Sequence, residues 1–155
     1  MNYWLFKSEP STYGIDHLAQ DKVTAWTGVR NYQARNFMRD LMKKGDRGFF
    51  YHSSCEVPGI AGIIEVARAA YPDETQFDRK TKYYDAAATK DAPRWFNVDV
   101  KFVKKTRVVA IPELRSHKVL KDMLILQRGN RLSITPVTKA EWDCIMAMMQ
   151  SKSGT

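Results

Sequence analysis

The sequence predicts an α+β protein in which a curled, mostly antiparallel sheet of five or six strands forms a pseudo-barrel with helices packed on its outside. Two observations predict this architecture. Strand-like and helix-like segments do not alternate regularly along the chain, so a doubly wound parallel sheet is not expected. Residues 59–68, GIAGIIEVAR, are apolar almost throughout, which is typical of a strand buried on both faces of a closed or nearly closed sheet.

The first half of the chain is expected to contain a strand, two helices and a hairpin. Residues 3–7, YWLFK, predict a buried opening strand, and a short helix is expected within residues 11–20. A second helix should end at Gly45, because apolar residues before it follow helical spacing: Ala34, Phe37, Met38 and Leu41. Residues 48–53 and 59–68 are rich in β-forming residues and predict the two strands of a hairpin.

The second half begins with a polar segment without period, residues 70–94, which predicts a long loop. Residues 95–109 predict a half-buried strand, and residues 131–137 predict one more short strand. Thr138 and Glu141 form a capping box before a helix with one apolar stripe: Trp142, Ile145, Met146 and Met149. Because loops longer than about 12–15 residues in compact domains are often functional, the long loop is expected to contribute to function.

The composition is typical of a globular protein, with 155 residues of which 44% are hydrophobic and 27% charged. One domain is expected over residues 1–150, followed by a disordered tail at residues 151–155. The start lacks a signal-peptide pattern, no run of about 18 apolar residues occurs, and Cys55 and Cys144 lie far apart in sequence. We therefore expect a monomeric, cytoplasmic protein with reduced thiols and no membrane partner.

Basic residues exceed acidic ones and give a formal net charge of +8. Residues 101–131 contain nine Lys or Arg against two acidic residues, and residues 30–47 contain six against two. Such an excess attracts polyanions, so contact with nucleic-acid phosphates is favoured over the alternative of two solvated faces that only keep the protein soluble. The candidate phosphate contacts are Arg30, Arg39, Lys101, Lys104 and Lys105.

The sequence carries no signature of catalysis or metal binding. Neither the nucleophile motif G-x-S-x-G nor a phosphate-binding glycine motif occurs. His17, His52 and His117 are scattered, and no cysteine or carboxylate stands at ligand spacing beside them. We therefore expect no catalytic residue, no metal site and no cofactor.

Residues 25–36, AWTGVRNYQARN, gather planar and polar side chains in one segment. The indole of Trp26 can stack on any nucleobase for about 1–3 kcal/mol, and the carboxamide of Asn31 can read a base edge. The alternative for Trp26 is an ordinary core tryptophan. Because Trp26 precedes a turn and a helix N-terminus, which attracts anions, a base-binding site is the favoured interpretation.

Six segments of the chain resemble the EVE domain family, and together they span about residues 2–149. They are YWLFKSEP, AWTGVRNYQARNFMRDLMKKGDRGFFYHS, PGIAGIIEV, TQFDRKTKYYD, RWFNVDVKFV and RLSITPVTKAEW. The resemblance implies a single domain with a PUA-like fold, related to the YTH domains that read methylated adenine in RNA. It also implies a non-catalytic domain that reads a modified base, for example a methylated or hydroxymethylated cytosine, flipped into an aromatic pocket.

Carried over to this sequence, the resemblance assigns Trp26 as the stacking wall of the pocket. Tyr84 is taken as the second wall, with the neighbouring Tyr83 as the alternative and Tyr71 and Trp95 as rivals. The complete predicted set of pocket residues is Lys7, Ser8, Trp26, Thr27, Gly28, Asn31, Tyr32, Arg35, Ser53, Ser54, Tyr84, Arg131 and Ser133.

The expected partner is DNA or RNA that carries a modified base, and the binding signal would pass through an effector protein or through occupancy alone. Two other functions stay open. One is an enzyme acting on RNA or modified nucleotides, with Lys7, Tyr32 and His52 as acid–base groups, because a fold does not fix a function. The other is an interaction domain whose basic surface recruits an acidic protein.

Overall fold

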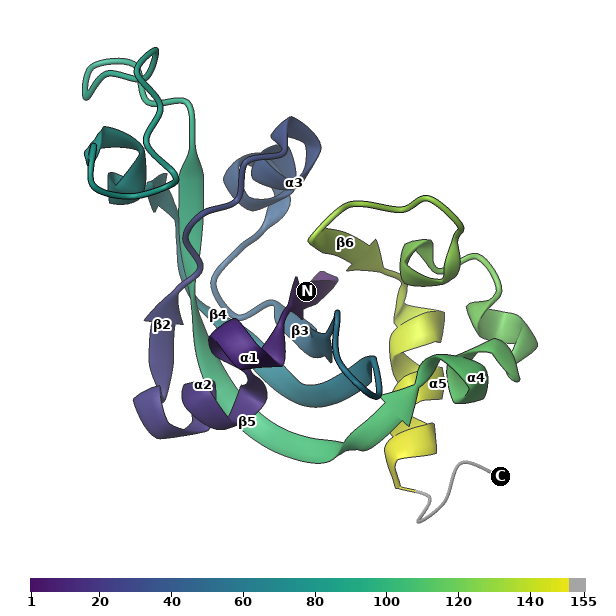
Figure 1. Ribbon diagram of the computed structural model, residues 1–155. Coiled ribbons are helices and arrows are strands. Elements are labelled where there is room, and N and C mark those ends of the chain that lie inside the picture. Colours follow the sequence, from purple (N-terminus) through teal and green to yellow (C-terminus); the bar gives the residue numbers. More distant parts are fainter. Residues whose placement is uncertain (151–155) are drawn as a thin grey trace.

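A mixed sheet of six strands, in the order β2-β5-β4-β3-β1-β6, forms the centre of the computed structural model, which describes residues 1–150 (Figure 1). The predicted tail, residues 151–155, lies outside the described residues. β1 and β3 pair in parallel and all other neighbours pair antiparallel. The sheet is curled but not closed. Its six strands with helices packed against them confirm the predicted α+β fold class. The strands are Tyr3–Ser8 (β1), Val23–Ala25 (β2), Arg47–His52 (β3), Gly59–Pro72 (β4), Phe96–Ala110 (β5) and Ile134–Val137 (β6).

The curl of the sheet comes from its two longest strands, β4 with 14 residues and β5 with 15. Their pairing register shifts at four places, between Ile60 and Tyr71. Bulges of this kind bend a strand and increase its twist, so the β4–β5 ribbon sweeps around the molecule instead of lying flat (Figure 1). The predicted hairpin is confirmed, since β3 and β4 pair from Arg47 opposite Glu65 to His52 opposite Gly59.

Short helices cover both faces of the sheet (Figure 1). None of the helices within residues 1–150 is long and apolar enough to cross a membrane. The α-helices are Pro10–Tyr13 (α1), Ile15–Asp21 (α2), Tyr32–Asn36 (α3), Ile111–Arg115 (α4) and Lys139–Met149 (α5). The remaining helical turns are the π-helix Phe37–Leu41 (η1) and the 3₁₀ turns Glu74–Phe77 (η2), Lys118–Leu120 (η3) and Leu124–Leu126 (η4).

The second predicted helix ends at Leu41 in the π-helix η1, so the predicted end at Gly45 is wrong. Met42 N–H donates to the Phe37 carbonyl and Met42 itself is extended. The buried carboxylate of Asp46 then accepts the Lys43 N–H at 3.0 Å, which holds the chain in a turn. Gly45 stands in this turn with φ +95°, a conformation that favours glycine.

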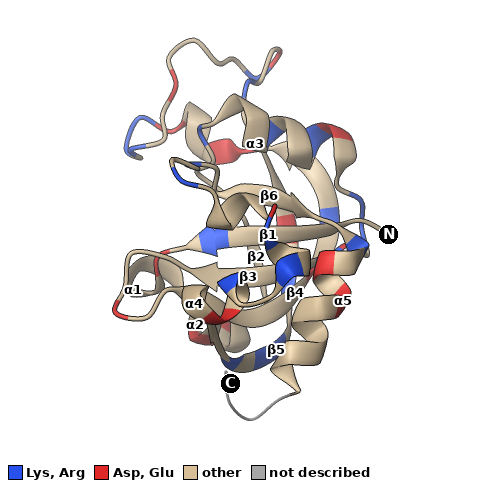
Figure 2. Cartoon of the chain, turned by 90° about the vertical axis from the view of Figure 1, so that its right-hand side faces the viewer, with Lys and Arg blue, Asp and Glu red and all other residues tan. Residues whose placement is uncertain are grey.

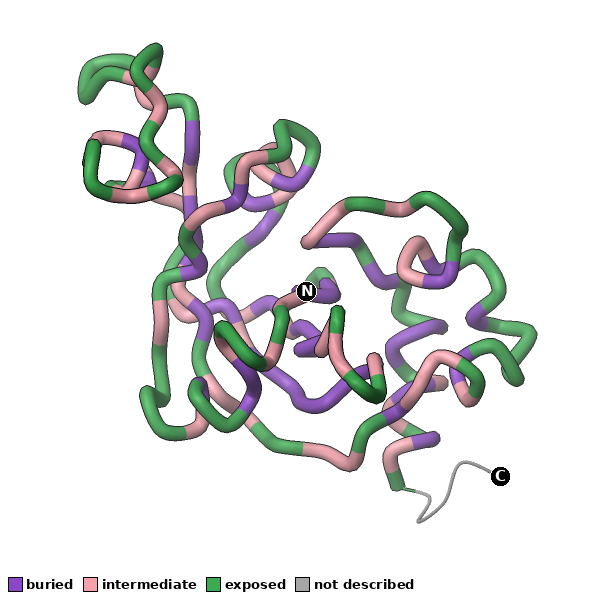
Figure 3. Tube along the Cα trace, viewed as in Figure 1, coloured by how far each residue is buried: buried purple, intermediate pink, exposed green. Residues whose placement is uncertain are grey.

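Two hydrophobic cores lie on opposite faces of the sheet, because successive side chains of a strand point to opposite sides. On β1, Trp4 and Phe6 belong to the first core, which lies under α2 and α3, and Leu5 belongs to the second, which lies under α4 and α5. Figure 3 shows the buried residues along the central strands and mainly exposed ones in the loop that follows η2. Trp26 belongs to the first core.

We expect Thr138→Ala to lower the free energy of unfolding by about 1 kcal/mol. The predicted capping box of α5 is confirmed: Thr138 Oγ1 accepts the Glu141 N–H at 3.1 Å, and Glu141 Oε1 accepts the Thr138 N–H at 2.9 Å. Urea denaturation measures the loss. Lys139→Ala is the control, because its ion pair with Asp143 is exposed and contributes little. An equal loss in the two variants would contradict the capping role.

Candidate functional site

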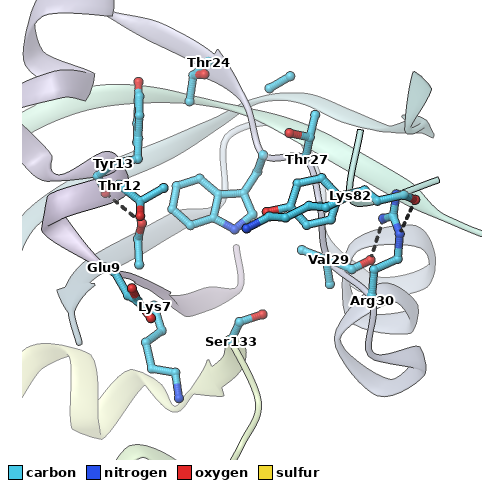
Figure 4. Close-up of a pocket in the computed structure, with 15 residues that line it drawn as sticks. Lys7, Glu9, Thr12, Tyr13, Thr24, Thr27, Val29, Arg30, Lys82 and Ser133 are labelled. Atoms are coloured by element: carbon cyan, nitrogen blue, oxygen red, sulfur yellow. Dashed lines mark hydrogen bonds between the residues drawn. The ribbon is translucent and has the colours of Figure 1, made fainter. Parts of the chain in front are cut away.

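A cavity of about 510 Å³ opens where the end of β1 meets α1 and the segment that follows β2 (Figure 4). Its size is that of pockets that hold small ligands. Seven residues of the predicted site or of the predicted phosphate contacts line it: Lys7, Ser8, Trp26, Thr27, Gly28, Arg30 and Ser133. Eight further residues line it that were not in either predicted set: Glu9, Thr12, Tyr13, Thr24, Ala25, Val29, Lys82 and Tyr83.

Trp26 is a core residue and a cavity wall at the same time. It is 9% exposed, and its ring packs edge to face against Phe6 at 5.2 Å and against Phe50 at 5.6 Å between centroids. Its backbone N–H donates to the Val98 carbonyl and extends the pairing of β2 with β5. The two interpretations of Trp26 are therefore compatible, since the indole that fills the core also lines the cavity.

Tyr83 is the tyrosine of the long loop that reaches the cavity, whereas the predicted Tyr84 is exposed and does not line it. The ring of Tyr83 lies against the backbone of Gly28. A Cβ at Gly28 would come within 2.6 Å of this ring, and the φ of Gly28 is +83°. Both facts require glycine at this position, so the contact fixes one side of the cavity.

A buried carboxylate connects the Trp26 segment to the long loop. Asp73 Oδ2 accepts the Gly28 N–H at 2.8 Å and forms an ion pair with Arg30 at 3.3 Å, and the Asp73 side chain is 0% exposed. Arg30 donates to the Tyr83 carbonyl from Nε at 3.1 Å and from Nη2 at 2.9 Å, and Nη2 also donates to Thr75 Oγ1. Arg30 therefore positions the Tyr83 loop, and its guanidinium is already engaged within the protein, which speaks against the predicted phosphate contact.

Three residues of the predicted pocket, Asn31, Tyr32 and Arg35, lie outside the cavity lining. Asn31 is the N-cap of α3, and its Oδ1 accepts the Ala34 N–H at 3.0 Å. The exposed ring of Tyr32 stacks on Trp95 with 4.7 Å between centroids, and the Arg35 guanidinium lies 4.7 Å from the Tyr32 centroid. The polar side chains of residues 25–36 thus diverge, some toward the cavity and some onto the surface of α3.

Ser53, Ser54 and Arg131 also lie outside the lining. The backbone N–H of Ser53 donates to the carbonyl of the lining residue Ser8 at 2.9 Å. Ser8 Oγ donates to the Tyr13 carbonyl at 2.7 Å. The Lys7 N–H donates to the Ser133 carbonyl at 2.8 Å and holds the segment before β6 beside the end of β1.

Four of the five predicted phosphate contacts already form an ion pair, including Arg30 with Asp73. Arg39 pairs with Asp40 at 2.8 Å, Lys101 with Glu65 at 2.9 Å and Lys105 with Asp16 at 2.9 Å. Lys101 lowers the pKa of Glu65, and Lys105 lowers the pKa of Asp16, because each ammonium hydrogen-bonds to the carboxylate. Lys104 is the one predicted contact with no ion pair among residues 1–150. Figure 2 shows basic and acidic positions interspersed along the chain.

The three acid–base groups of the enzyme alternative do not all lie at the cavity. Lys7 lines the cavity, but Tyr32 and His52 do not. His52 Nε2 accepts the Ile15 N–H at 3.1 Å, and burial lowers the pKa of the imidazole, so its free electron pair caps α2. Within residues 1–150, no group of three or more His, Cys, Asp or Glu residues is placed to hold a metal ion.

Comparison with known sequences identifies relatives over almost the whole chain. The model of the EVE domain matches residues 2–148. Thymocyte nuclear protein 1 of Gallus gallus is 43% identical, and the match covers 97% of this chain and 69% of that protein. Thymocyte nuclear protein 1 of Homo sapiens is also 43% identical, over 97% of this chain and 75% of that protein.

Two solved structures have the same fold. Human THYN1 protein, solved in complex with 5-methylcytosine containing DNA, matches with a TM-score of 0.91 and 42% identity over 99% of this chain and 100% of that chain. A protein from Pseudomonas putida matches with a TM-score of 0.91 and 49% identity over 95% of this chain and 99% of that chain.

Proposed function

We propose that this chain, which belongs to the EVE domain family, is a non-catalytic nucleic-acid-binding domain that holds a modified base in the cavity between Trp26 and Tyr83. One observation carries the proposal: a cavity lined by these two aromatic residues lies in a chain 42% identical to human THYN1, a protein solved with 5-methylcytosine containing DNA. We propose a modified cytosine as the ligand for the same reason.

The geometry of the cavity supports a single extruded base. The cavity lies at the end of β1 and of β2, and three aromatic side chains line it, those of Tyr13, Trp26 and Tyr83. A base must leave its stack to enter such a site, which costs a few kcal/mol in a duplex and less in a single strand. Stacking on an aromatic ring returns about 1–3 kcal/mol. Single-stranded or already unpaired targets are therefore the preferred ligands.

Polar groups around the aromatic walls supply the means to read the edge of the base. Glu9 is the carboxylate of the lining, and a carboxylate can accept a hydrogen bond from the exocyclic amine of cytosine. The hydroxyls of Thr27 and Ser133 and the ammonium of Lys7 add donors (Figure 4). This set of one strong acceptor among several donors suits the Watson–Crick edge of a cytosine, which has one donor and two acceptors.

The separation of the acid–base groups favours a reader over an enzyme. A general base must lie within hydrogen-bond reach of the reacting atom, and His52 and Tyr32 lie outside the cavity. We propose further that residues 1–150 act as one domain, because both cores share a single sheet, and that this domain is monomeric and intracellular. Any signal would then pass to an effector protein or arise from occupancy.

The test compares Tyr83→Ala with its neighbour Tyr84→Ala. Both are titrated with short single-stranded DNA that carries one 5-methylcytosine or one cytosine at the same position. The wild type should prefer the modified strand, Tyr83→Ala should lose about 1–3 kcal/mol of binding to it, and Tyr84→Ala should behave like the wild type.

Equal binding of the two strands by the wild type would overturn the modified cytosine as the ligand. An unchanged affinity in Tyr83→Ala would overturn the second wall. Product formation during the titration, followed by mass spectrometry of the oligonucleotide, would replace the reader by an enzyme.

A further inference from the structure

Three cations in or near the cavity lining form no ion pair among residues 1–150, and we call Lys7, Lys82 and Arg131 the rim cations. Lys7 and Lys82 line the cavity, and Arg131 precedes the lining residue Ser133 by two positions. None of the three forms an ion pair with any part of the chain between residues 1 and 150. Lys82 and Arg131 are exposed.

The rim cations come from separate parts of the fold that the cavity brings together. Lys7 is the penultimate residue of β1, and its backbone N–H donates to the carbonyl of Ser133, two positions after Arg131, at 2.8 Å. Lys82 belongs to the long loop, and its Nζ lies 5.2 Å from the centroid of the Tyr83 ring. Lys82 thus contacts the proposed second wall (Figure 4), while Arg131 lies in the segment just before β6.

A cation without an ion pair gains more binding free energy from a phosphate contact than a paired cation does. A lysine in an ion pair must give up its carboxylate when it meets a phosphate, so little net attraction remains. This applies to Lys101 and Lys105 on β5, which already contact Glu65 and Asp16. The rim cations have no such partner to lose, and each can release counterions from the nucleic acid on contact.

We propose that the rim cations bind the phosphates on either side of the base that enters the cavity, and that the lysines of β5 do not. Lys101 and Lys105 are already paired, and the unpaired Lys104 lies outside the cavity lining. The inference rests on the proposed function, because it takes the cavity as the site of the base. It moves the phosphate-binding surface from β5, where the sequence predicts it, to the mouth of the cavity. The ligand is a single nucleic-acid strand, because such a strand can place a base in the cavity and its neighbouring phosphates on the rim cations at the same time.

The test measures the salt dependence of binding to an unmodified single-stranded oligonucleotide. The variants are Lys82→Ala, Arg131→Ala and the double variant, and the matched control is Lys104→Ala. Lys82 and Lys104 are both exposed lysines without an ion pair among residues 1–150, so these two variants differ in position and in the contact of Lys82 with the Tyr83 ring. Circular dichroism confirms that each variant is folded.

We expect the slope of log K against log salt to become shallower by about 0.7 in each single rim variant and by about 1.4 in the double variant. The control should keep the wild-type slope. An equal change in the rim variants and in Lys104→Ala, or no change in the rim variants, would overturn the assignment. Failure of the proposed function is read separately, because it would remove the preference for a modified base and leave these slopes on plain DNA as they are.

Discussion

Trp26→Ala should lower the free energy of unfolding and abolish the preference for a modified base. Trp26 is 9% exposed and packs against Phe6 and Phe50, so its truncation leaves a cavity in the first core that costs about 3–5 kcal/mol. It also removes the proposed stacking wall. Guanidinium denaturation and titration with the paired modified and plain oligonucleotides measure the two effects.

The two roles of Trp26 are separated by a smaller change. Trp26→Phe keeps an aromatic ring in the core and reduces the surface on which a base can stack, so it should weaken discrimination with a smaller loss of stability. Trp142→Phe is the matched control. Trp142 is 7% exposed, belongs to the second core and stacks on Tyr3 and Phe49, outside the cavity. Loss of discrimination in the control as well would show that general destabilisation is the cause.

The second large effect is expected from Asp73→Asn, which should lower the free energy of unfolding by about 3 kcal/mol. The substitution removes the buried negative charge that pairs with Arg30, whose own side chain is 22% exposed. The Asp73 carboxylate accepts the Gly28 N–H on one oxygen and the Thr75 N–H and hydroxyl on the other. An amide has one acceptor oxygen, so donors on one side of it would lose their partner.

The same variant should weaken binding of the modified oligonucleotide, because Arg30 and Gly28 hold Tyr83. Urea denaturation gives the stability and fluorescence titration the affinity. Asp78→Asn is the control in the same loop, since this exposed carboxylate accepts the Lys80 N–H near the surface. A variant with normal affinity and reduced stability would show that Tyr83 stays in place without the Asp73 contact.

The fold was predictable where local patterns agree with tertiary packing. The capping box at Thr138 indicates a helix and the alternation of residues 95–109 indicates a strand, and both elements form as predicted. β2 was missed because Val23–Ala25 is a short edge strand with no buried residue, and its pairing with β5 is a long-range contact. The end of the second helix was missed because the Asp46 carboxylate accepts the Lys43 N–H and holds the chain in a turn, and helix propensities do not include such a side-chain contact.

The site was predictable as a neighbourhood and less so residue by residue. The end of β1 and the segment after β2 do line one cavity. Asn31 shows the limit, because the same side chain suits a base edge and a helix N-cap, and only the position of α3 decides between them. Tyr83 and Tyr84 are adjacent in a loop without period, so the distinction between them depends on the distant contact with Gly28.

The double membership of Trp26 constrains how such a protein can change its ligand. A residue that replaces this indole must pack against Phe6 and Phe50 and also bind the ligand, so we expect few substitutions at the Trp26 wall of the cavity. Lys82 and Tyr83 project from a loop, where exchanges disturb little of the core. Relatives with different ligand preferences are therefore expected to differ on the loop side of the cavity and to keep the indole.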